Sequence, residues 1–272
     1  MSNKRIVNKL LSYSIVLIGL ISLSVSTHAQ VPCLPANTSF QEGEKLTFKV
    51  YYNMSFVWIN AGNAEFTTSI EDVANRKAYH VRGVGKTASS FEWFYKVLDT
   101  YESYIDRQTM LPMRFVRHVN EGGMKIINDV KFDHRNKQAT SDNKAYAIPD
   151  CTQDVLSAMY FARNINYNSH KPGDKISFDM FLDNQVYNLY VKYIGKEQIT
   201  TRMGTFNAIK IVPLLIKGTI FKGGEKMTIW LSDDPNHIPV RVESPILIGS
   251  VKIDLMDFSN LRNPLTGMIS RN

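Results

Sequence analysis

Long hydrophobic runs and a large excess of one charge are both missing from most of this sequence of 272 residues. Leu10 to Val25 is mostly apolar, and no later stretch is long and apolar enough to span a membrane. Lys and Arg number 32 against 25 Asp and Glu, a modest excess that predicts no nucleic-acid partner. Apolar residues at 44% and charged residues at 21% exclude a disordered chain, a coiled coil and a polytopic membrane protein.

Motifs for metal binding and for hydrolysis are also missing. No histidine after residue 29 has a second His or Cys at metal-ligand spacing, and no His-Glu-x-x-His occurs. These histidines are His80, His118, His134, His170 and His237. The absence of a Gly-x-Ser-x-Gly elbow excludes an α/β-hydrolase. We therefore expect no metal site and no cofactor.

The segment Gly83–Thr87 reads Gly-Val-Gly-Lys-Thr, like the end of a phosphate-binding loop. The first glycine of that motif would fall at position 80, which is His80. The motif also needs a helix after its lysine, whereas Thr87–Phe91 leads into an aromatic run. Nucleotide binding is therefore not expected.

An export signal is present at the N-terminus. Three basic residues precede an apolar stretch of about 16 residues, shorter than the ~20 that a spanning helix needs. Thr27-His28-Ala29 then places small residues at the −3 and −1 positions of a cleavage site. We predict a signal peptide over residues 1–29, cleavage between Ala29 and Gln30, and a periplasmic protein. An uncleaved anchor helix is the alternative.

Cysteine is scarce, and the two cysteines, Cys33 and Cys151, allow a single pairing in an oxidising compartment. We predict a Cys33–Cys151 disulfide that joins the mature N-terminus to the middle of the chain. Two buried free thiols, or one reactive thiol, are the alternative. Lipidation of Cys33 is disfavoured, because Gln30 and Pro32 stand where a lipidation site has Leu and a small residue.

Apolar and polar residues alternate with period 2 through most of the chain after residue 40, as from Lys45 to Val50. Turn signals such as Glu121-Gly122-Gly123 and Lys171–Asp174 separate these runs. Further strand-like runs are 126–132, 176–182, 187–194, 206–212, 227–231, 240–242 and 251–258. Many short strands at nearly even spacing predict an all-β, mainly antiparallel protein.

One segment departs from this pattern and predicts a helix over about residues 151–164. Asp150 and Gln153 fit an N-cap and its partner three positions later. The apolar residues that follow at helical spacing are Val155, Leu156, Met159 and Tyr160. We expect this apolar stripe to face the core.

Three short phrases occur twice in the same order. They are Gly43–Phe48 with Gly173–Phe178, Leu111–Phe115 with Ile238–Val242, and Val130–Asp133 with Val251–Asp254. We predict two similar curved sheets or half-barrels joined by the helix, forming one domain or two. Their bounds are an N-terminal lobe over 30–149, the helix over 150–165 and a C-terminal lobe over 166–272. Chance reuse of turn and strand phrases is the alternative.

The second of these phrases carries a proline and an arginine in each copy. Pro112 and Pro239 lack a backbone donor, so each should stand at the start of a strand or at a sheet edge. Arg114 and Arg241 point away from their apolar neighbours and are expected to pair with acids on the solvent face.

Aromatic residues are dense in two segments, Tyr51–Trp58 and Phe91–Tyr95. Alternate aromatic side chains on the concave side of a curved sheet can line an apolar groove. The candidate ligand-binding residues are Tyr52, Trp58, Trp93, Tyr95 and Trp230. Filling of the core is the alternative for these side chains.

Paired carboxylates keep an enzyme under consideration. Asp99, Glu102 and Asp106 lie in one strand-like stretch, and Asp233 and Asp234 lie in the matching part of the second half. Glycosidases need two carboxyls that face each other across a cleft. The run that begins at Asp233 is better explained as a turn.

The sequence resembles an exported bacterial family, domain of unknown function 3108 (DUF3108), over nearly all of the mature chain. The segments that carry the likeness are Gly43–Tyr52, Ala61–Ala64, Asp154–Ser157, Met203–Phe206, Ile229–Asp233 and Ile238–Arg241. The resemblance implies an envelope protein of Gram-negative bacteria with no established activity and no known catalytic residues. The pattern is also similar to periplasmic half-barrel carriers of the lipoprotein-localisation type, a likeness of fold that says little about function.

The leading hypothesis is a non-enzymatic exported protein that binds a lipid or another amphipathic ligand, or an envelope protein, in a concavity of the sheet. The second hypothesis is a glycan-active hydrolase that uses Asp99, Glu102 or Asp233. The third is a structural interaction protein that uses an exposed sheet edge.

Overall fold

The computed structural model describes residues 33, 36–54, 57–93, 95–216, 223–246 and 248–272. The predicted signal peptide, residues 1–29, lies outside the described residues. Every element below belongs to the compact unit Cys33–Asn272. In the described part of the chain no helix is long and apolar enough to cross a membrane.

Fifteen strands form one sheet. The first eight strands are β1 (Lys45–Met54), β2 (Val57–Val73), β3 (Arg76–Thr87), β4 (Leu98–Asp106), β5 (Pro112–Glu121), β6 (Met124–Asp133), β7 (Gln138–Ser141) and β8 (Lys144–Ala147). The helices are α2 (Val155–Arg163) and the 3₁₀ turn η1 (Tyr167–Ser169). The later strands are β9 (Lys175–Leu182), β10 (Gln185–Thr200), β11 (Gly204–Pro213), β12 (Thr228–Ser232), β13 (Pro239–Pro245), β14 (Ser250–Ser259) and β15 (Met268–Arg271).

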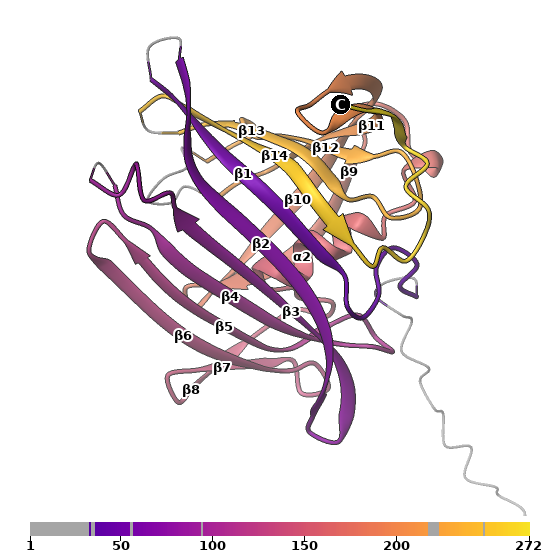
Figure 1. Ribbon diagram of the computed structural model, residues 1–272. Helices are drawn as coiled ribbons and strands as arrows, with labels where there is room; N and C mark the ends of the chain where they lie inside the picture. The colour runs from indigo at the N-terminus through magenta and orange to yellow at the C-terminus, as the bar shows by residue number, and fades with distance from the viewer. Residues whose placement is uncertain (1–32, 34–35, 55–56, 94, 217–222, 247) are drawn as a thin grey trace, which may run out of the picture. The chain divides into compact units, whose positions relative to one another are not determined.

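Neighbouring strands of the sheet are antiparallel and mostly consecutive in the chain. The spatial order is β8-β7-β6-β5-β4-β3-β2-β1-β14-β13-β12-β11-β10-β9, and β15 pairs with β11. The seam between β1 and β14 therefore joins the first and last parts of the chain within one continuous, curved sheet (Figure 1). This confirms the predicted mainly antiparallel fold, with one α-helix among the described residues, and it shows that hydrogen bonds unite the two halves.

A meander of six strands occurs twice, as β1–β6 and as β9–β14. Gly43 and Gly173, both with positive φ, precede the first strand of each copy. The second strand of each copy is unusually long, with 17 residues in β2 and 16 in β10. Pro112 and Pro239 begin the fifth strands, as predicted. The first two repeated phrases thus occupy equivalent places in the two meanders, whereas the third ends β6 in one copy and begins β14 in the other.

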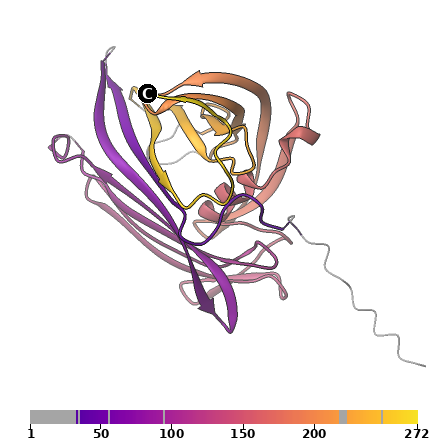
Figure 2. The ribbon, with the colours of Figure 1, turned by 45° about the vertical axis from the view of Figure 1, so that its right-hand side comes forward.

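Helix α2 lies between the two arms of the curved sheet (Figures 1 and 2). Its start packs on the first half, where Leu156 and Tyr160 join a buried cluster with Phe40 and Tyr79. Its end packs on the second half, where Ala162 lies in a cluster of buried residues from β10, β11 and β12. Burial of this stripe on both sides explains why α2 is retained in a β protein.

The two arms of the sheet also contact each other. Phe181 of β9 is 1% exposed and packs with Phe115, Val130 and Ala139 of the first half. An ion pair between Arg117 and Asp183 crosses the same contact. These contacts bring the free edge of the second half against the first and give the sheet its barrel-like closure.

The helix begins four residues later than predicted. Cys151 has a positive φ of 67°, which an α-helix does not allow, and the backbone of Gln153 forms hydrogen bonds with Asp179 and Phe181 of β9. The N-cap is Asp154, whose side chain accepts hydrogen bonds from the backbone N–H groups of Leu156 and Ser157. The predicted Asp150 cap was therefore wrong, because pairing with the sheet edge holds the preceding residues extended.

The disulfide between Cys33 and Cys151 is present, with the two Cα atoms 5.4 Å apart. It bridges 118 positions of the chain and attaches the start of the described chain just before α2. No free cysteine remains in the described residues. The predicted pairing is therefore confirmed.

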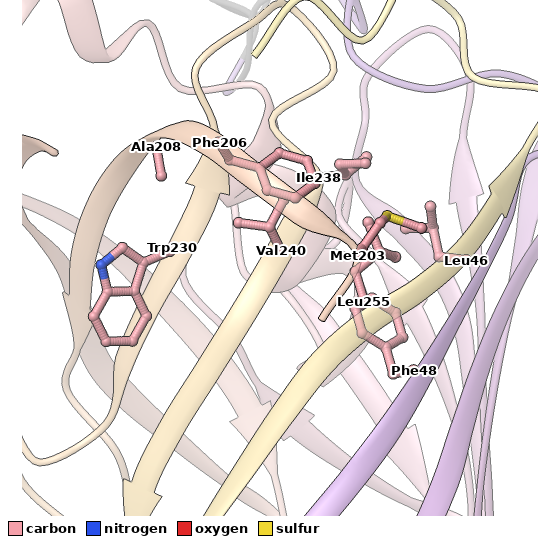
Figure 3. Close-up of a cluster of buried hydrophobic side chains, with 9 residues drawn as sticks. All are labelled: Leu46, Phe48, Met203, Phe206, Ala208, Trp230, Ile238, Val240 and Leu255. Carbon is pink, nitrogen blue, oxygen red and sulfur yellow. The ribbon is translucent and has the colours of Figure 1, made fainter. Parts of the chain in front are cut away.

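A third core cluster lies at the seam and in the C-terminal half (Figure 3). Leu46 and Phe48 of β1 and Leu255 of β14 belong to it. Phe206, Ile238 and Val240 pack together beside them, and the indole of Trp230 lies at one side (Figure 3). Hydrophobic burial thus reinforces the backbone pairing between the two ends of the chain.

Candidate functional site

A pocket of about 370 Å³ opens beside the seam between β1 and β14. Its lining residues come from β1, β2, β13, β14, the turn between β10 and β11, and the end of the chain. They are Tyr51, Trp58, Thr200, Thr201, Arg202, Arg241, Lys252, Asp254 and Asn272. The pocket therefore combines two aromatic rings with three cations and one carboxylate.

Strand alternation produces the floor of this pocket. Along β14, Lys252 and Asp254 alternate with Ile253 and Leu255, which pack into the core cluster of the seam. Tyr51 of β1 lies opposite Lys252 in the register of the two strands. One face of the seam is thus apolar and buried, and the other presents polar and aromatic side chains.

The turn between β10 and β11 forms one wall. Gly204 has a φ of 153°, and a Cβ there would lie 2.0 Å from the carbonyl oxygen of Ser270 in β15. Asn272 follows β15 and donates a backbone hydrogen bond to Met203 O at 3.0 Å. The tight packing of β15 against β11 therefore fixes the turn that carries Arg202.

The three cations of the pocket differ in how closely each is paired with a carboxylate. Arg241 donates two hydrogen bonds to Asp254, at 2.6 and 2.9 Å. Burial opposes its charge, but Asp254 outweighs burial and raises the pKa of Arg241. Arg202 lies over the Tyr51 ring at 4.6 Å and forms no ion pair with any described residue. Lys252 lies 4.2 Å from the centre of the Trp58 ring and 3.9 Å from Glu243.

Tyr51 has an unusual environment at the base of the pocket. Burial raises the pKa of its hydroxyl, and the nearby Arg202 opposes that shift. The hydroxyl oxygen is buried and has no hydrogen-bond partner among the described residues. An unsatisfied buried polar group costs about 1–3 kcal/mol. A ligand atom that reached this hydroxyl would remove that cost.

The charged groups of the pocket suit an anionic ligand. Its carboxylate, Asp254, is 2% exposed and is held by Arg241. No cluster of three or more potential metal ligands occurs in the described ranges. Two cations without a close, strong carboxylate partner, Arg202 and Lys252, can instead attract an anionic group. The rings of Tyr51 and Trp58 offer an apolar or planar surface next to it.

The five aromatic residues proposed from the sequence lie in different surroundings. Trp58 lines the pocket. Tyr52 points to the other side of β1, where it is 6% exposed and donates a hydrogen bond to Ile248 O at 3.2 Å. Trp230 belongs to the core, and its Nε1 donates to Glu197 at 2.7 Å. The structure thus places Trp58 in the pocket and gives Tyr52 and Trp230 packing roles.

Trp93 and Tyr95 lie in the connection between β3 and β4. The Trp93 side chain is 83% exposed, and its Nε1 donates to Ser90 O at 3.1 Å. Tyr95 is 38% exposed, and its ring packs on Gly122 in the turn between β5 and β6. Both side chains lie at one end of the strands and outside the lining of the pocket.

The candidate carboxylates of a hydrolase do not converge. Asp99 is buried near the start of β4, where it accepts a hydrogen bond from Asn120 N at 2.9 Å. Glu102 contacts His80 at 3.1 Å. Asp233 pairs with Lys196 at 2.8 Å in the turn after β12, at the opposite end of the strands from Asp99. Each carboxylate therefore has its own local partner.

Several pocket residues were not among the sequence candidates. Tyr51, Arg202 and Lys252 lacked a recognisable motif, because the pocket assembles across non-consecutive strands. Arg241 stood out through its repeated phrase, and it pairs with an acid as predicted, but that acid, Asp254, is buried and not on the solvent face. Arg114, its counterpart in the first half, pairs with Asp129 in the same bidentate way. Of the two arginines, the pocket contains Arg241.

Comparisons with known proteins support the architecture. A family model described as a protein of unknown function, DUF3108, matches residues 47–256. None of the curated proteins matches the sequence. Among solved structures, a beta-barrel-like protein of the DUF1849 family from Brucella abortus is similar, with a TM-score of 0.52 and 10% identity. The similarity covers 82% of this chain and 99% of that one, and it supports the barrel-like fold.

Two further structures show weaker likeness. A candidate lipoprotein from Parabacteroides distasonis has a TM-score of 0.37 and 14% identity, over 83% of this chain and 99% of that one. A candidate exported protein with a YmcC-like fold from Bacteroides fragilis has a TM-score of 0.38 and 14% identity. That match covers 81% of this chain and 97% of the other.

Proposed function

The chain belongs to the DUF3108 family, whose description names no activity, and from the chain's own residues we propose a binding function. The protein is an exported, non-enzymatic component of the cell envelope that binds an amphipathic ligand with an anionic group. The observation that carries this proposal is the pocket at the β1–β14 seam, which combines unequally paired cations with aromatic rings.

The anionic group of the ligand belongs beside Arg202 and Lys252. Arg202 lies on the Tyr51 ring without an acidic partner among the described residues, so its guanidinium is available for a bidentate contact. Arg241 is already committed to Asp254 and helps to hold the wall by donating to Thr200 O at 3.2 Å. A hydrogen bond to a charged group contributes about 1.5–3 kcal/mol.

The apolar part of the ligand belongs against Trp58. This ring is half-buried at the mouth of the pocket, under the ammonium group of Lys252. A ligand with both an acidic head and an apolar tail therefore fits better than either part alone. A purely hydrophobic ligand would desolvate Arg202 without giving its guanidinium an anionic partner.

Two observations support export. The disulfide between Cys33 and Cys151 fits an oxidising compartment. The first 29 residues have the basic, apolar and small-residue order of a signal peptide. The periplasm is the compartment proposed from both.

The proposal is tested by isothermal titration calorimetry with three probes. Octyl phosphate carries both parts of the ligand, octyl glucoside has the same tail with a neutral head, and inorganic phosphate has no tail. We expect octyl phosphate to bind more tightly than either of the others. Arg202→Gln should weaken its binding by about 10-fold or more, because one charged hydrogen-bonding partner is lost.

Arg107→Gln is the matched control. Arg107 is also exposed and lies over a tyrosine ring, that of Tyr79, at 5.4 Å, but it is outside the pocket. Its replacement should leave the affinity unchanged. Equal affinity for octyl phosphate and octyl glucoside, or equal effects of the two arginine substitutions, would contradict an anion-selective pocket.

A further inference from the structure

Most large apolar side chains that are exposed in the described residues gather at one end of the strands. Seven of these side chains make up what we term the apolar rim. They are Val57, Ile59, Trp93, Tyr95, Leu98, Met124 and Ile248. Ile127 inside β6, Met159 on α2 and Ile269 on β15 are also exposed but are not part of the apolar rim.

Strand direction explains why these residues share one end of the sheet. β1, β3, β5 and β13 end there, whereas β2, β4, β6 and β14 begin there, because neighbouring strands are antiparallel. The described residues at these strand ends therefore lie along one side of the sheet, on the left in Figure 1. Each of the four connections, β1–β2, β3–β4, β5–β6 and β13–β14, contributes with its flanking strand ends at least one apolar rim residue.

Direct contacts join these connections into one surface. Gly249 packs against Asn53 at the end of β1, where a Cβ would lie 2.3 Å from the Asn53 carbonyl oxygen. The Tyr52 and Phe91 rings lie 5.9 Å apart and link β1 to the β3–β4 connection. Gly122 N donates to Lys96 O at 2.9 Å and links that connection to the β5–β6 turn. The segments that carry the apolar rim residues therefore lie side by side.

The charges around the apolar rim are mainly positive. Lys86, Lys96 and Lys125 are exposed there, and Lys86 and Lys125 form no ion pair in the described part of the chain. Glu92 lies 3.9 Å from Lys96, and Glu121 is buried. The apolar rim side chains and the unpaired lysines beside them therefore complement a surface that has an anionic outer layer and an apolar interior.

We propose that the apolar rim docks the protein on an anionic lipid surface. Trp93 and Tyr95 have the amphipathic rings that favour a membrane interface, and the Trp93 N–H is already bonded within the protein. Apolar side chains that project separately can each insert between lipid molecules. The exposed lysines add electrostatic attraction to anionic headgroups. This inference does not depend on the ligand of the pocket, because none of the seven apolar rim residues lines it.

Vesicle flotation tests the proposal with leader-free protein, which retains the compact unit Cys33–Asn272. Vesicles of phosphatidylglycerol and phosphatidylethanolamine should carry the protein, whereas phosphatidylcholine vesicles should carry at least threefold less. Trp93→Ser with Ile248→Ser should reduce the bound fraction at least fivefold. Lys86→Gln with Lys125→Gln should reduce it severalfold on the anionic vesicles.

Ile269→Ser and Met159→Ser are matched controls, because they remove exposed apolar side chains away from the apolar rim and should leave binding unchanged. Circular dichroism checks that each variant is folded. A wild type that does not float, or apolar rim variants that float like the wild type, would overturn the proposal. Loss of flotation in Arg202→Gln alone would overturn it too, because capture of a headgroup in the pocket would then explain the binding.

Discussion

Asp154 is a fully buried carboxyl that caps helix α2. Its side chain accepts hydrogen bonds from Ser103 Oγ at 2.6 Å and from the N–H groups of Leu156 and Ser157 at 2.8 Å. Burial raises its pKa to about 6, and these hydrogen bonds only partly offset the effect of burial. The ionised form is therefore less favourable in the folded protein than in the unfolded chain.

The raised pKa predicts a pH-dependent contribution to stability. The contribution of Asp154 is fully present below its unfolded pKa of about 4 and is lost as the pH rises through about 6. Asp154→Asn keeps a capping oxygen and removes this titration. The free energy of unfolding of the wild type, relative to this variant, should therefore fall by about 2–3 kcal/mol between pH 4 and pH 7, measured by urea unfolding.

Asp133→Asn is the control for this experiment. Hydrogen bonds from the backbone and side chain of Asn136 lower the pKa of the exposed Asp133, so its contribution has the opposite pH dependence. A difference between the wild type and Asp154→Asn that does not change with pH would contradict the raised pKa.

At the scale of elements, Gly204 allows β15 to pack closely against β11 and so fixes the turn that forms one wall of the pocket. Gly204→Ala would place a methyl group about where the Ser270 carbonyl oxygen lies and would strain a backbone with a φ of 153°. We expect a loss of about 1–3 kcal/mol in the free energy of unfolding, together with weaker binding of octyl phosphate, because the turn that carries Arg202 shifts.

Gly85→Ala in β3 is the matched substitution. A Cβ at Gly85 would have no heavy atom within 4 Å, so the change should be close to neutral. Thermal unfolding and calorimetry of both variants check the prediction. Equal effects of the two substitutions would show that the close approach of β15 to β11 is unimportant.

Most strands could be predicted from the sequence, because period-2 alternation and turn residues are local signals. Gly122 and Gly123 indeed form the turn between β5 and β6, and Asp233–Asn236 connects β12 to β13. The helix start could not be predicted well, because Gln153 is held extended by β9, a partner that follows it in the chain by about 26 residues. Asp150 and Asp154 are both possible helix caps by local sequence. The pairing of Gln153 with β9 makes Asp154 the N-cap.

At the scale of the whole molecule, the repeated phrases indicated two similar halves, and the topology contains the same six-strand meander twice. The sequence did not reveal that β1 and β14 would pair, because no local pattern specifies which strands become neighbours. The pocket depends on that pairing, since Tyr51 and Lys252 meet across it while Arg202 arrives from a third region. Candidate residues chosen by aromatic density therefore included Trp58 but missed the cations.

The central claim is that the pocket at the β1–β14 seam holds an anionic amphiphile. Native mass spectrometry of protein purified without detergent from the envelope of cells that produce it tests this claim most directly. The wild type should carry an additional mass that releases an acidic, lipid-like compound, and Arg202→Gln should carry little or none of it. A wild type without such a mass, or a neutral compound retained equally by Arg202→Gln, would contradict the account.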